Sequence, residues 1–148
     1  MVTYRYKFEK ILQIREQEKE EMQNSYMESV KKFEEAAEKL YKLLKKKEEL
    51  IDYQEKKMGS GFSIYEVQHY QQFVSNLEKT IAFQQQIVIR ARNQMQWCEQ
   101  QLQERNIEVK KYEKMKEKDF KKFNASLLMA EQHQMDEIST IQFMNQRN

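Results

Sequence analysis

Apolar residues recur every seven positions along the second half of the chain. This row and a companion row three residues further on define one continuous seam. The first row consists of Val67, Val74, Ile81, Val88, Met95, Leu102 and Val109, and the second of Tyr70, Leu77, Gln84, Ala91, Cys98, Arg105 and Tyr112. A 3.5-residue repeat kept over this length predicts a long helix, from about residue 64 to about residue 141, that supercoils against a partner helix.

The first half of the chain carries a more interrupted version of the same pattern. Steps of four and three residues from Phe8 to Gln54 reach fourteen positions, of which nine are apolar or aromatic. The polar members are Arg15, Lys19, Ser29, Lys47 and Gln54. This pattern predicts a first helix from about residue 3 to about residue 57, with a seam that contains polar gaps.

The stretch from Met58 to Ser63 separates the two periodic halves. It holds both glycines of a chain that has no proline. Gly59 is placed to end the first helix in the left-handed conformation. Ser63 and Glu66 form the S-x-x-E pattern of a capping box at the start of the second. Because so short a connection favours antiparallel neighbours, we predict an all-α fold: a long antiparallel two-helix coiled-coil hairpin, forming a single domain over residues 1–148.

The pairing of the hairpin predicts a segment of the second helix without a partner. If residue 58 faces residue 64, Leu12 lies opposite Val109, and the first helix runs out opposite about residue 120. The segment 120–144 then overhangs, although it is rich in apolar side chains: Phe120, Phe123, Leu127, Leu128, Met129, Met135, Ile138, Ile141, Phe143 and Met144. An unpartnered apolar stripe usually marks an interaction site. The alternative is that this end folds back, or frays and is disordered.

The charged composition is typical of long helices, and the balance of its charges restricts the kind of partner that the chain could bind. Charged residues make up 34% of the 148 residues, and 26 basic against 24 acidic side chains leave a net charge of +2. This balance argues against a general polyanion binder. The lysines of 110–122 alternate with acidic residues, as on a solvated helix face, so nucleic-acid binding is a minor alternative. The sequence shows no apolar run of membrane-spanning length and no secretory signal, which points to the cytosol.

Catalytic and cofactor chemistry find no support in the sequence. There is no phosphate-binding glycine loop, metalloprotease motif or nucleophile elbow. His69 and His133 are too far apart in the hairpin to share a metal, and Cys98 lies on the seam. We therefore expect no enzyme, no metal and no cofactor. One further feature is an off-seam face made of Phe83, Ile87, Arg90 and Trp97, which is either a partner face or a set of scattered surface apolar residues.

Several short motifs resemble the FliJ family of flagellar type III export proteins, in particular its Bacillus-type members. The resemblance extends over nearly the whole chain and is most specific around the connection between the helices. The motifs are Met58-Gly59-Ser60-Gly61, Tyr70-Gln71-Gln72-Phe73, Leu77-Glu78-Lys79-Thr80-Ile81, Tyr6-Lys7-Phe8-Glu9-Lys10-Ile11-Leu12-Gln13-Ile14-Arg15, Lys116-Glu117-Lys118-Asp119-Phe120 and Met135-Asp136-Glu137.

The resemblance implies a fold and a function. Members of the family are two-helix coiled coils similar to the stalk subunit of rotary ATPases. The family resemblance implies a non-catalytic stalk in the pore of the hexameric flagellar export ATPase, where it promotes ring assembly and hydrolysis. It also implies contacts with the membrane protein of the export gate and with export chaperones. The expected location is cytoplasmic and peripheral, at the inner face of the cell membrane at the flagellar base.

Two sets of residues carry over from the family. The gate-contacting surface would lie on the hinge half, at Leu43, Leu50, Phe73 and Leu77. The family can show aromatic residues where this chain has Lys46 and Leu50, a departure from its pattern. The ATPase-inserting end would be the opposite one, at Phe120, Phe123, Leu127 and Ile138. The alternative function is a passive coiled-coil escort or adaptor for export chaperones, or an injectisome stalk counterpart.

Overall fold

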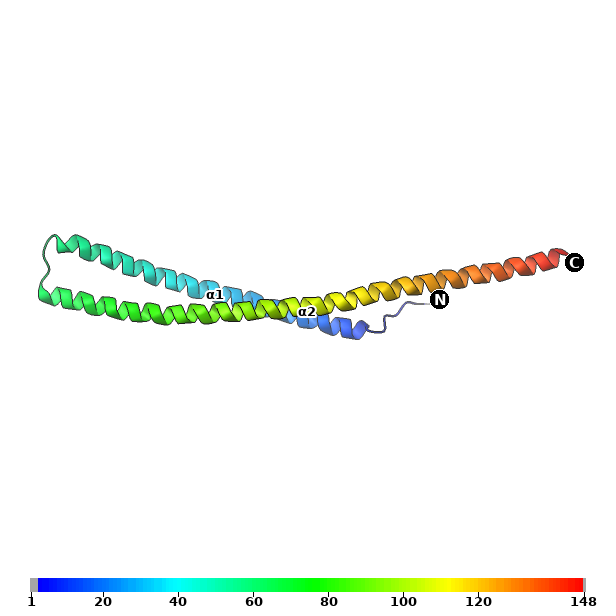
Figure 1. The fold of residues 1–148 in the computed structure, drawn as a ribbon, viewed down its shortest axis with the longest axis horizontal. Coiled ribbons are helices and arrows are strands. Elements are labelled where there is room, and N and C mark those ends of the chain that lie inside the picture. Colours follow the sequence, from blue (N-terminus) through cyan, green and yellow to red (C-terminus); the bar gives the residue numbers. More distant parts are fainter. Residues whose placement is uncertain (1–2, 148) are drawn as a thin grey trace. The chain divides into compact units, whose positions relative to one another are not determined.

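Two long helices form the fold. The computed structural model describes residues 3–147, and in this range it contains α1 (Glu9–Met58) and α2 (Ile64–Arg147) and no strand (Figure 1). The all-α fold class is therefore confirmed. The helices pack into two compact units, which are described one at a time. Unit 1 comprises residues 3–20 with 104–147, and unit 2 comprises Glu21–Gln103.

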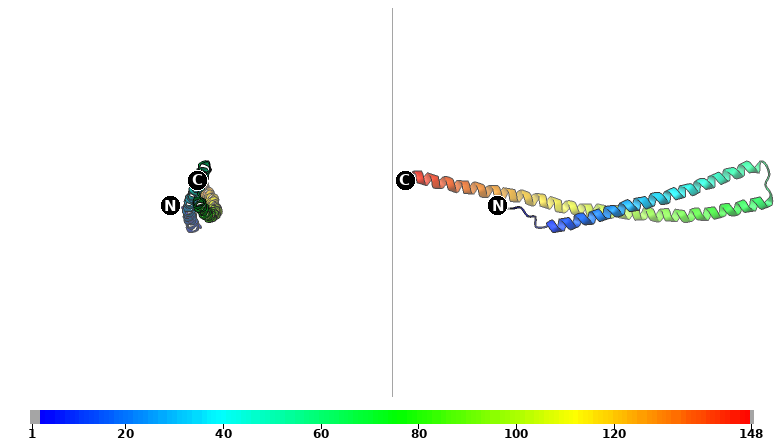
Figure 2. Two further views of the ribbon diagram at one scale, coloured as in Figure 1. Left: turned by 90° about the vertical axis from the view of Figure 1, so that its left-hand side faces the viewer. Right: turned by 180° about the vertical axis from the view of Figure 1, so that it is seen from behind.

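Unit 2 is an antiparallel helical hairpin. Its two helical arms run alongside each other from the connection onward in Figure 1 and in the right-hand view of Figure 2. Residues that follow one another in α1 meet residues in reverse order in α2. The guanidinium of Arg92 lies 5.8 Å from the ring centre of Phe33, and Lys47 Nζ lies 3.5 Å from a carboxylate oxygen of Glu78. This reverse order confirms the antiparallel pairing in this unit.

The predicted seam is the buried seam. All fourteen positions predicted for each helix are buried or half-buried. The buried members in unit 2 are Ser29, Ala36, Leu77, Ile81, Gln84 and Cys98. Gln84 shows how a polar residue is tolerated there, because its Nε2 donates a hydrogen bond to the backbone oxygen of Ala36 at 3.1 Å. The 3.5-residue repeat therefore identified the face on which the two helices meet.

The connection is closed by backbone conformation and by side-chain caps. Gly61, not Gly59, takes the positive φ of +90°, so the sequence-based choice of glycine was wrong. At the end of α1 both the backbone nitrogen and the hydroxyl of Ser60 donate to the backbone oxygen of Lys57, at 3.1 and 3.0 Å. These bonds end the helix without a left-handed Gly59. At the start of α2, Ser63 Oγ accepts a hydrogen bond from the backbone nitrogen of Glu66 at 3.2 Å, as the capping pattern predicts.

Unit 1 begins differently from the sequence-based expectation. The first helix starts at Glu9, not near residue 3, and residues 3–6 lie outside helix and turn. Tyr4, Tyr6 and Phe8 are buried or half-buried, whereas the intervening Thr3, Arg5 and Lys7 are exposed. This two-residue alternation over residues 3–6 is typical of an extended segment with one face on a surface, and Lys7 and Phe8 then form a turn into α1. We call residues 3–8 the N-terminal strap.

The far end of α2 extends beyond its packed part. The helix continues to Arg147, whereas the sequence pattern suggested an end near residue 141. Each residue in the range 124–147 is exposed, in contrast to Val109, which is 2% exposed. The buried cluster of unit 1 consists of Tyr6, Leu12 and Val109, with Tyr4, Phe8 and Tyr112 packed against it. Leu12 and Val109 therefore meet as the predicted pairing requires.

Candidate interaction surfaces

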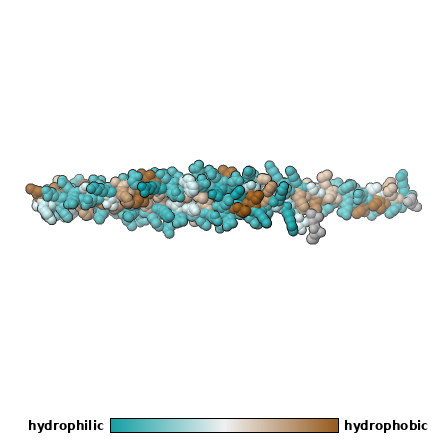
Figure 3. Space-filling model, turned by 90° about the horizontal axis from the view of Figure 1, so that it is seen from below, coloured by the Kyte–Doolittle hydropathy of each residue, from teal (hydrophilic) through white to brown (hydrophobic). Residues whose placement is uncertain are grey.

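The C-terminal part of α2 presents apolar side chains to solvent. We call these residues the tail surface: Leu127, Leu128, Met129, Met135, Ile138, Ile141, Phe143 and Met144. Leu127 is 37% and Ile138 51% exposed. Hydrophobic side chains are visible in brown near the right-hand end of Figure 3, where Figure 1 places this part of the helix. So many exposed large apolar residues on one helix indicate a protein-interaction surface.

The N-terminal strap covers the residues that precede the tail surface. The Tyr4 ring lies edge-on to the Phe120 ring at a centroid distance of 5.0 Å and is tilted against the Phe123 ring at 5.3 Å. Phe123 is half-buried, and Phe120 is 46% exposed. The overhang expected from residue 120 onward is thus partly covered up to Phe123, because the strap extends the cover beyond the first residue of α1.

Hydroxyl groups and an ion pair hold the strap and the start of α1 on α2. Tyr4 donates a hydrogen bond to Asp119 Oδ2 at 2.9 Å, and Tyr6 donates one to the backbone oxygen of Tyr112 at 3.1 Å. Lys116 Nζ lies 2.9 Å from a carboxylate oxygen of Glu9. Burial of its hydroxyl, and then the hydrogen bond to Asp119, raise the pKa of Tyr4 to about 12. Burial and the charge of Asp119 likewise raise the pKa of Tyr6.

Titration of Tyr4 gives a test of these contacts. A raised pKa means that the neutral phenol is favoured in the folded state. The stability that this contact contributes is therefore fully present below pH 10 and is lost as the pH rises through about 12. In an ultraviolet titration of tyrosinate, we expect Tyr4 and Tyr6 to titrate later than ordinary tyrosines, with Tyr4→Phe removing the Tyr4 step near pH 12 and Asp119→Asn moving it to lower pH. An unchanged titration curve for Tyr4→Phe would contradict the assignment.

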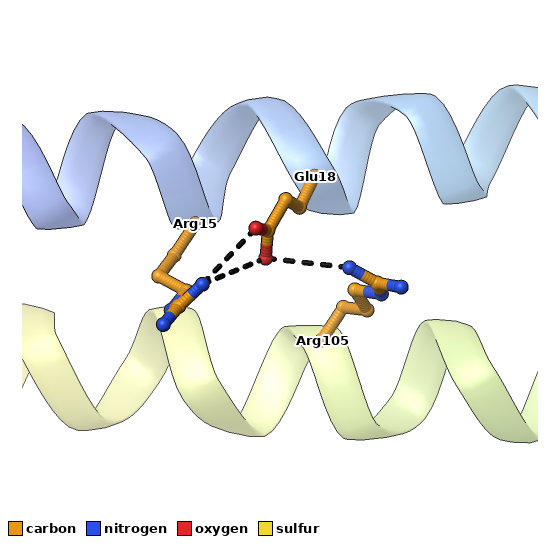
Figure 4. Close-up of polar contacts among 3 residues, drawn as sticks. All are labelled: Arg15, Glu18 and Arg105. Carbon is orange, nitrogen blue, oxygen red and sulfur yellow. Dashed lines mark hydrogen bonds and ion pairs between the residues drawn. The ribbon is translucent and has the colours of Figure 1, made fainter.

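Two arginines share one carboxylate in unit 1. Arg15 Nη1 lies 3.0 and 3.1 Å from the two carboxylate oxygens of Glu18, and Arg105 Nη1 lies 3.3 Å from one of them (Figure 4). The hydrogen bond to Glu18 is the main reason that the pKa of Arg15 is raised. Arg15 Nε is buried and has no hydrogen-bond partner among residues 3–147. Arg15 and Arg105 occupy seam positions, and Glu18 is next to one. The carboxylate of Glu18 pairs with both guanidinium groups, which explains how the seam accommodates a charged residue at Arg15.

The hinge half contains the residues expected to contact the export gate. Leu43 and Leu50 are half-buried, Phe73 is 43% exposed, and Leu77 is 7% exposed. Lys46 Nζ lies 5.6 Å from the ring centre of Phe73. Leu50 and Phe73 also line a groove of about 300 Å³, together with Tyr53, Lys57, Phe62, Tyr65, Glu66, His69 and Tyr70. Of the four predicted residues, Phe73 is the most accessible, while Leu77 packs into the seam.

The off-seam face of α2 is exposed in unit 2. Phe83 is 68% and Trp97 53% exposed, Arg90 is exposed, and Ile87 is half-buried. Cys98 lies on the buried seam with 2% exposure, where its sulfur accepts a 3.7 Å hydrogen bond from Gln94. Within residues 3–147, no three histidine, cysteine or acidic side chains gather as metal ligands would.

Comparison with known proteins identifies the family of the chain. The family model described as "Flagellar FliJ protein" matches residues 4–148. The Flagellar FliJ protein of Bacillus subtilis (strain 168) is 50% identical over 145 residues, which are 98% of this chain and 99% of that protein. No solved structure matches the chain. Neither helix of the described range contains a stretch apolar enough to cross a bilayer. The chain belongs to the FliJ family of flagellar export proteins.

Proposed function

We propose that this chain is a non-catalytic central stalk of the flagellar type III export apparatus, in which its single coiled-coil domain binds in the hexameric export ATPase. In this role it promotes assembly and activity of the ATPase. It also links the ATPase to the cytoplasmic domain of the export-gate membrane protein and to export chaperones. The observation that carries the proposal is the tail surface, whose apolar side chains have no cover within residues 3–147.

The ATPase contact is proposed at Phe120, Phe123, Leu127 and Ile138. The first three are spaced by three and four residues, so they share one face of α2. Ile138 lies eleven residues after Leu127, which is close to three helical turns and returns to the same face. An apolar stripe of this kind fits an apolar groove or pore in a protein partner. Family membership supports the export ATPase as that partner.

The gate contact is proposed on the hinge half. Phe73 would make the direct contact because it is exposed, whereas Leu43, Leu50 and Leu77 would shape the surface from the seam. The groove beside Phe73 is lined mainly by aromatic side chains and supports the proposal. The proposed location is cytoplasmic, peripheral at the inner face of the membrane at the flagellar base.

A second candidate function is a passive escort or adaptor for export chaperones. The exposed face of Phe83, Ile87, Arg90 and Trp97 favours it, because exposed aromatic and arginine side chains are frequent anchors of protein interfaces. This face lies in unit 2 and is separate in sequence from the tail surface. The two functions can therefore be tested with different variants.

Measurement of ATP hydrolysis by the purified export ATPase tests the proposal. We expect the full chain to stimulate hydrolysis and a chain cut after Phe123 to lose this stimulation. The cut keeps the strap contacts, and the described residues that it removes, 124–147, are all exposed. The matched control is Trp97→Ala, which alters the other exposed face and should stimulate like the unmodified chain. Equal stimulation by the cut chain would exclude the tail surface as the ATPase contact. Absence of stimulation by the full chain would favour the escort.

A further inference from the structure

The N-terminal strap consists of an anchor and a tip that differ in how they are held. The anchor, Tyr6, is 8% exposed and belongs to the buried cluster with Leu12 and Val109. The tip, residues 3–5, contributes one half-buried side chain, Tyr4, between the exposed Thr3 and Arg5. The anchor is therefore part of the core of unit 1, and the tip is a loosely attached extension of it.

Among the described residues of the tip, Tyr4 makes the aromatic contacts and side-chain hydrogen bonds to α2. The Tyr4 ring packs on Phe120 and Phe123, and its hydroxyl donates to Asp119 and, at 3.4 Å, to the backbone oxygen of Lys116. In the described part of the chain, no backbone hydrogen bond joins residues 3–5 to α2. Segments outside regular secondary structure that have few such bonds open locally at low free-energy cost.

The surface under the tip belongs to the same stripe as the tail surface. Phe123 follows Phe120 by three residues, and Leu127 follows Phe123 by four, so the three side chains form one row on α2. With the tip in place, Tyr4 occupies the start of this row. With the tip lifted, the row is continuous from Phe120 into the tail surface.

We infer that the strap tip is a releasable cover that masks Phe120 and Phe123 in the free protein and gives way to the export ATPase on binding. This inference rests on the proposed function, because it names the regulation of the same surface. The cover shields part of the Phe120 ring and most of the Phe123 ring from water until the partner is present. Binding then includes the free-energy cost of lifting the tip. The apparent affinity for the ATPase is therefore the intrinsic affinity multiplied by the fraction of molecules in which the tip is open.

The free protein provides the first test, which needs no ATPase. Trypsin cleaves after Arg5, at the junction of tip and anchor, and cleavage requires that the tip and the adjoining backbone of Tyr6 lift from α2. We expect Tyr4→Ala to accelerate this cleavage about two- to tenfold, the range that corresponds to one aromatic contact. Tyr4→Phe keeps the ring and loses only the hydroxyl bond, so its acceleration should be smaller. Cleavage after Lys57, in unit 2, is the internal control. An unchanged rate after Arg5 in Tyr4→Ala would overturn the inference.

The complex with the ATPase provides the second test. Tyr4→Ala should lower the concentration of this protein that gives half-maximal stimulation, again about two- to tenfold. A raised or unchanged concentration would overturn the inference, because Tyr4 would then be part of the contact or irrelevant to it. If the full chain fails to stimulate at all, the proposed function fails, and the cleavage result still decides whether the tip opens.

Nitroxide labels show directly whether the tip moves. Labels at Thr3 and Lys122, both exposed, report the distance between the tip and α2. We expect this distance to lengthen when the ATPase is added. The control pair is Lys10 and Glu117, exposed neighbours of the ion-paired Glu9 and Lys116, and its distance should not change. A constant distance for the first pair in the complex would show that the tip stays in place and would overturn the inference.

Discussion

Replacing Leu12 by alanine should lower the free energy of unfolding of unit 1 by about 2–5 kcal/mol. Leu12 is 3% exposed and packs with Tyr6 and Val109 in a cluster that contains few buried side chains. Removal of the side chain loses its transfer free energy and leaves a cavity between α1 and α2, which two long helices cannot close without bending. Urea unfolding followed by circular dichroism measures the change.

The matched control for this substitution is Ile14→Ala. Ile14 lies half a turn away on the same helix and is 52% exposed. Its replacement removes a similar side chain from a position that buries little, so the change should stay within about 0.5 kcal/mol. If both substitutions cost the same, the packing of Leu12 against α2 is not what stabilises unit 1.

Replacing Glu18 by glutamine should cost about 1–2 kcal/mol, a large effect for a site that is partly exposed. The change removes the negative charge that Arg15 and Arg105 share and leaves two guanidinium groups facing each other across the seam. The side chains of these residues are 32–39% exposed, so solvent screens part of the repulsion. The loss should therefore shrink in about 1 M salt.

Glu28→Gln is the control for Glu18→Gln. Glu28 makes a single ion pair with Lys32 on the outer face of α1, at 3.6 Å, and its side chain is 69% exposed. Such a pair contributes about 0.3–0.5 kcal/mol at most. Thermal unfolding of both variants at low and high salt separates the two cases. Equal losses would indicate that the shared carboxylate has no special role in the seam.

The fold could be predicted from the sequence because burial in a two-helix hairpin depends only on the position of each residue along its helix. A two-helix seam is determined by spacing alone, so Lys47 and Gln54 could be assigned to it although they are polar, and both are half-buried. The choice between two glycines was different. Gly59 directly follows α1, but the end of that helix is capped by the hydrogen bonds of Ser60 to Lys57, and the positive φ occurs at Gly61, further into the connection.

The strap was not predicted because the helical period that begins at Phe8 was extended backward over a short two-residue alternation. Phe8 begins the helical seam, and extending that period backward placed the first helix near residue 3. The signal that could have found the strap is the alternation Thr3-Tyr4-Arg5-Tyr6-Lys7-Phe8, in which every second residue is aromatic. A two-residue period predicts an extended segment with one buried face. Its contacts with Phe120 and Phe123 join residues more than a hundred positions apart, which no local pattern reveals.

The candidate site was predictable in outline only. The excess length of the second helix predicted an uncovered apolar segment, and the exposed residues of 124–147 agree with that expectation. The hinge residues illustrate the limit of such reasoning, because Leu43, Leu50 and Leu77 lie on the seam, where the same apolar character serves packing. Sequence spacing cannot separate a residue that packs from one that binds a partner when both requirements select leucine.

The uncovered end of α2 has a consequence for how its helix forms. Residues 124–147 are all exposed, so packing does not stabilise a helix there, and starting a helix is costly in water. This segment instead continues a helix whose first turns are already formed upstream, so each added residue requires only propagation. Its helicity therefore depends on the preceding packed turns. A substitution such as Leu12→Ala, which destabilises the packed part of unit 1, should therefore also lower the helicity of the tail surface, although Leu12 touches none of its residues.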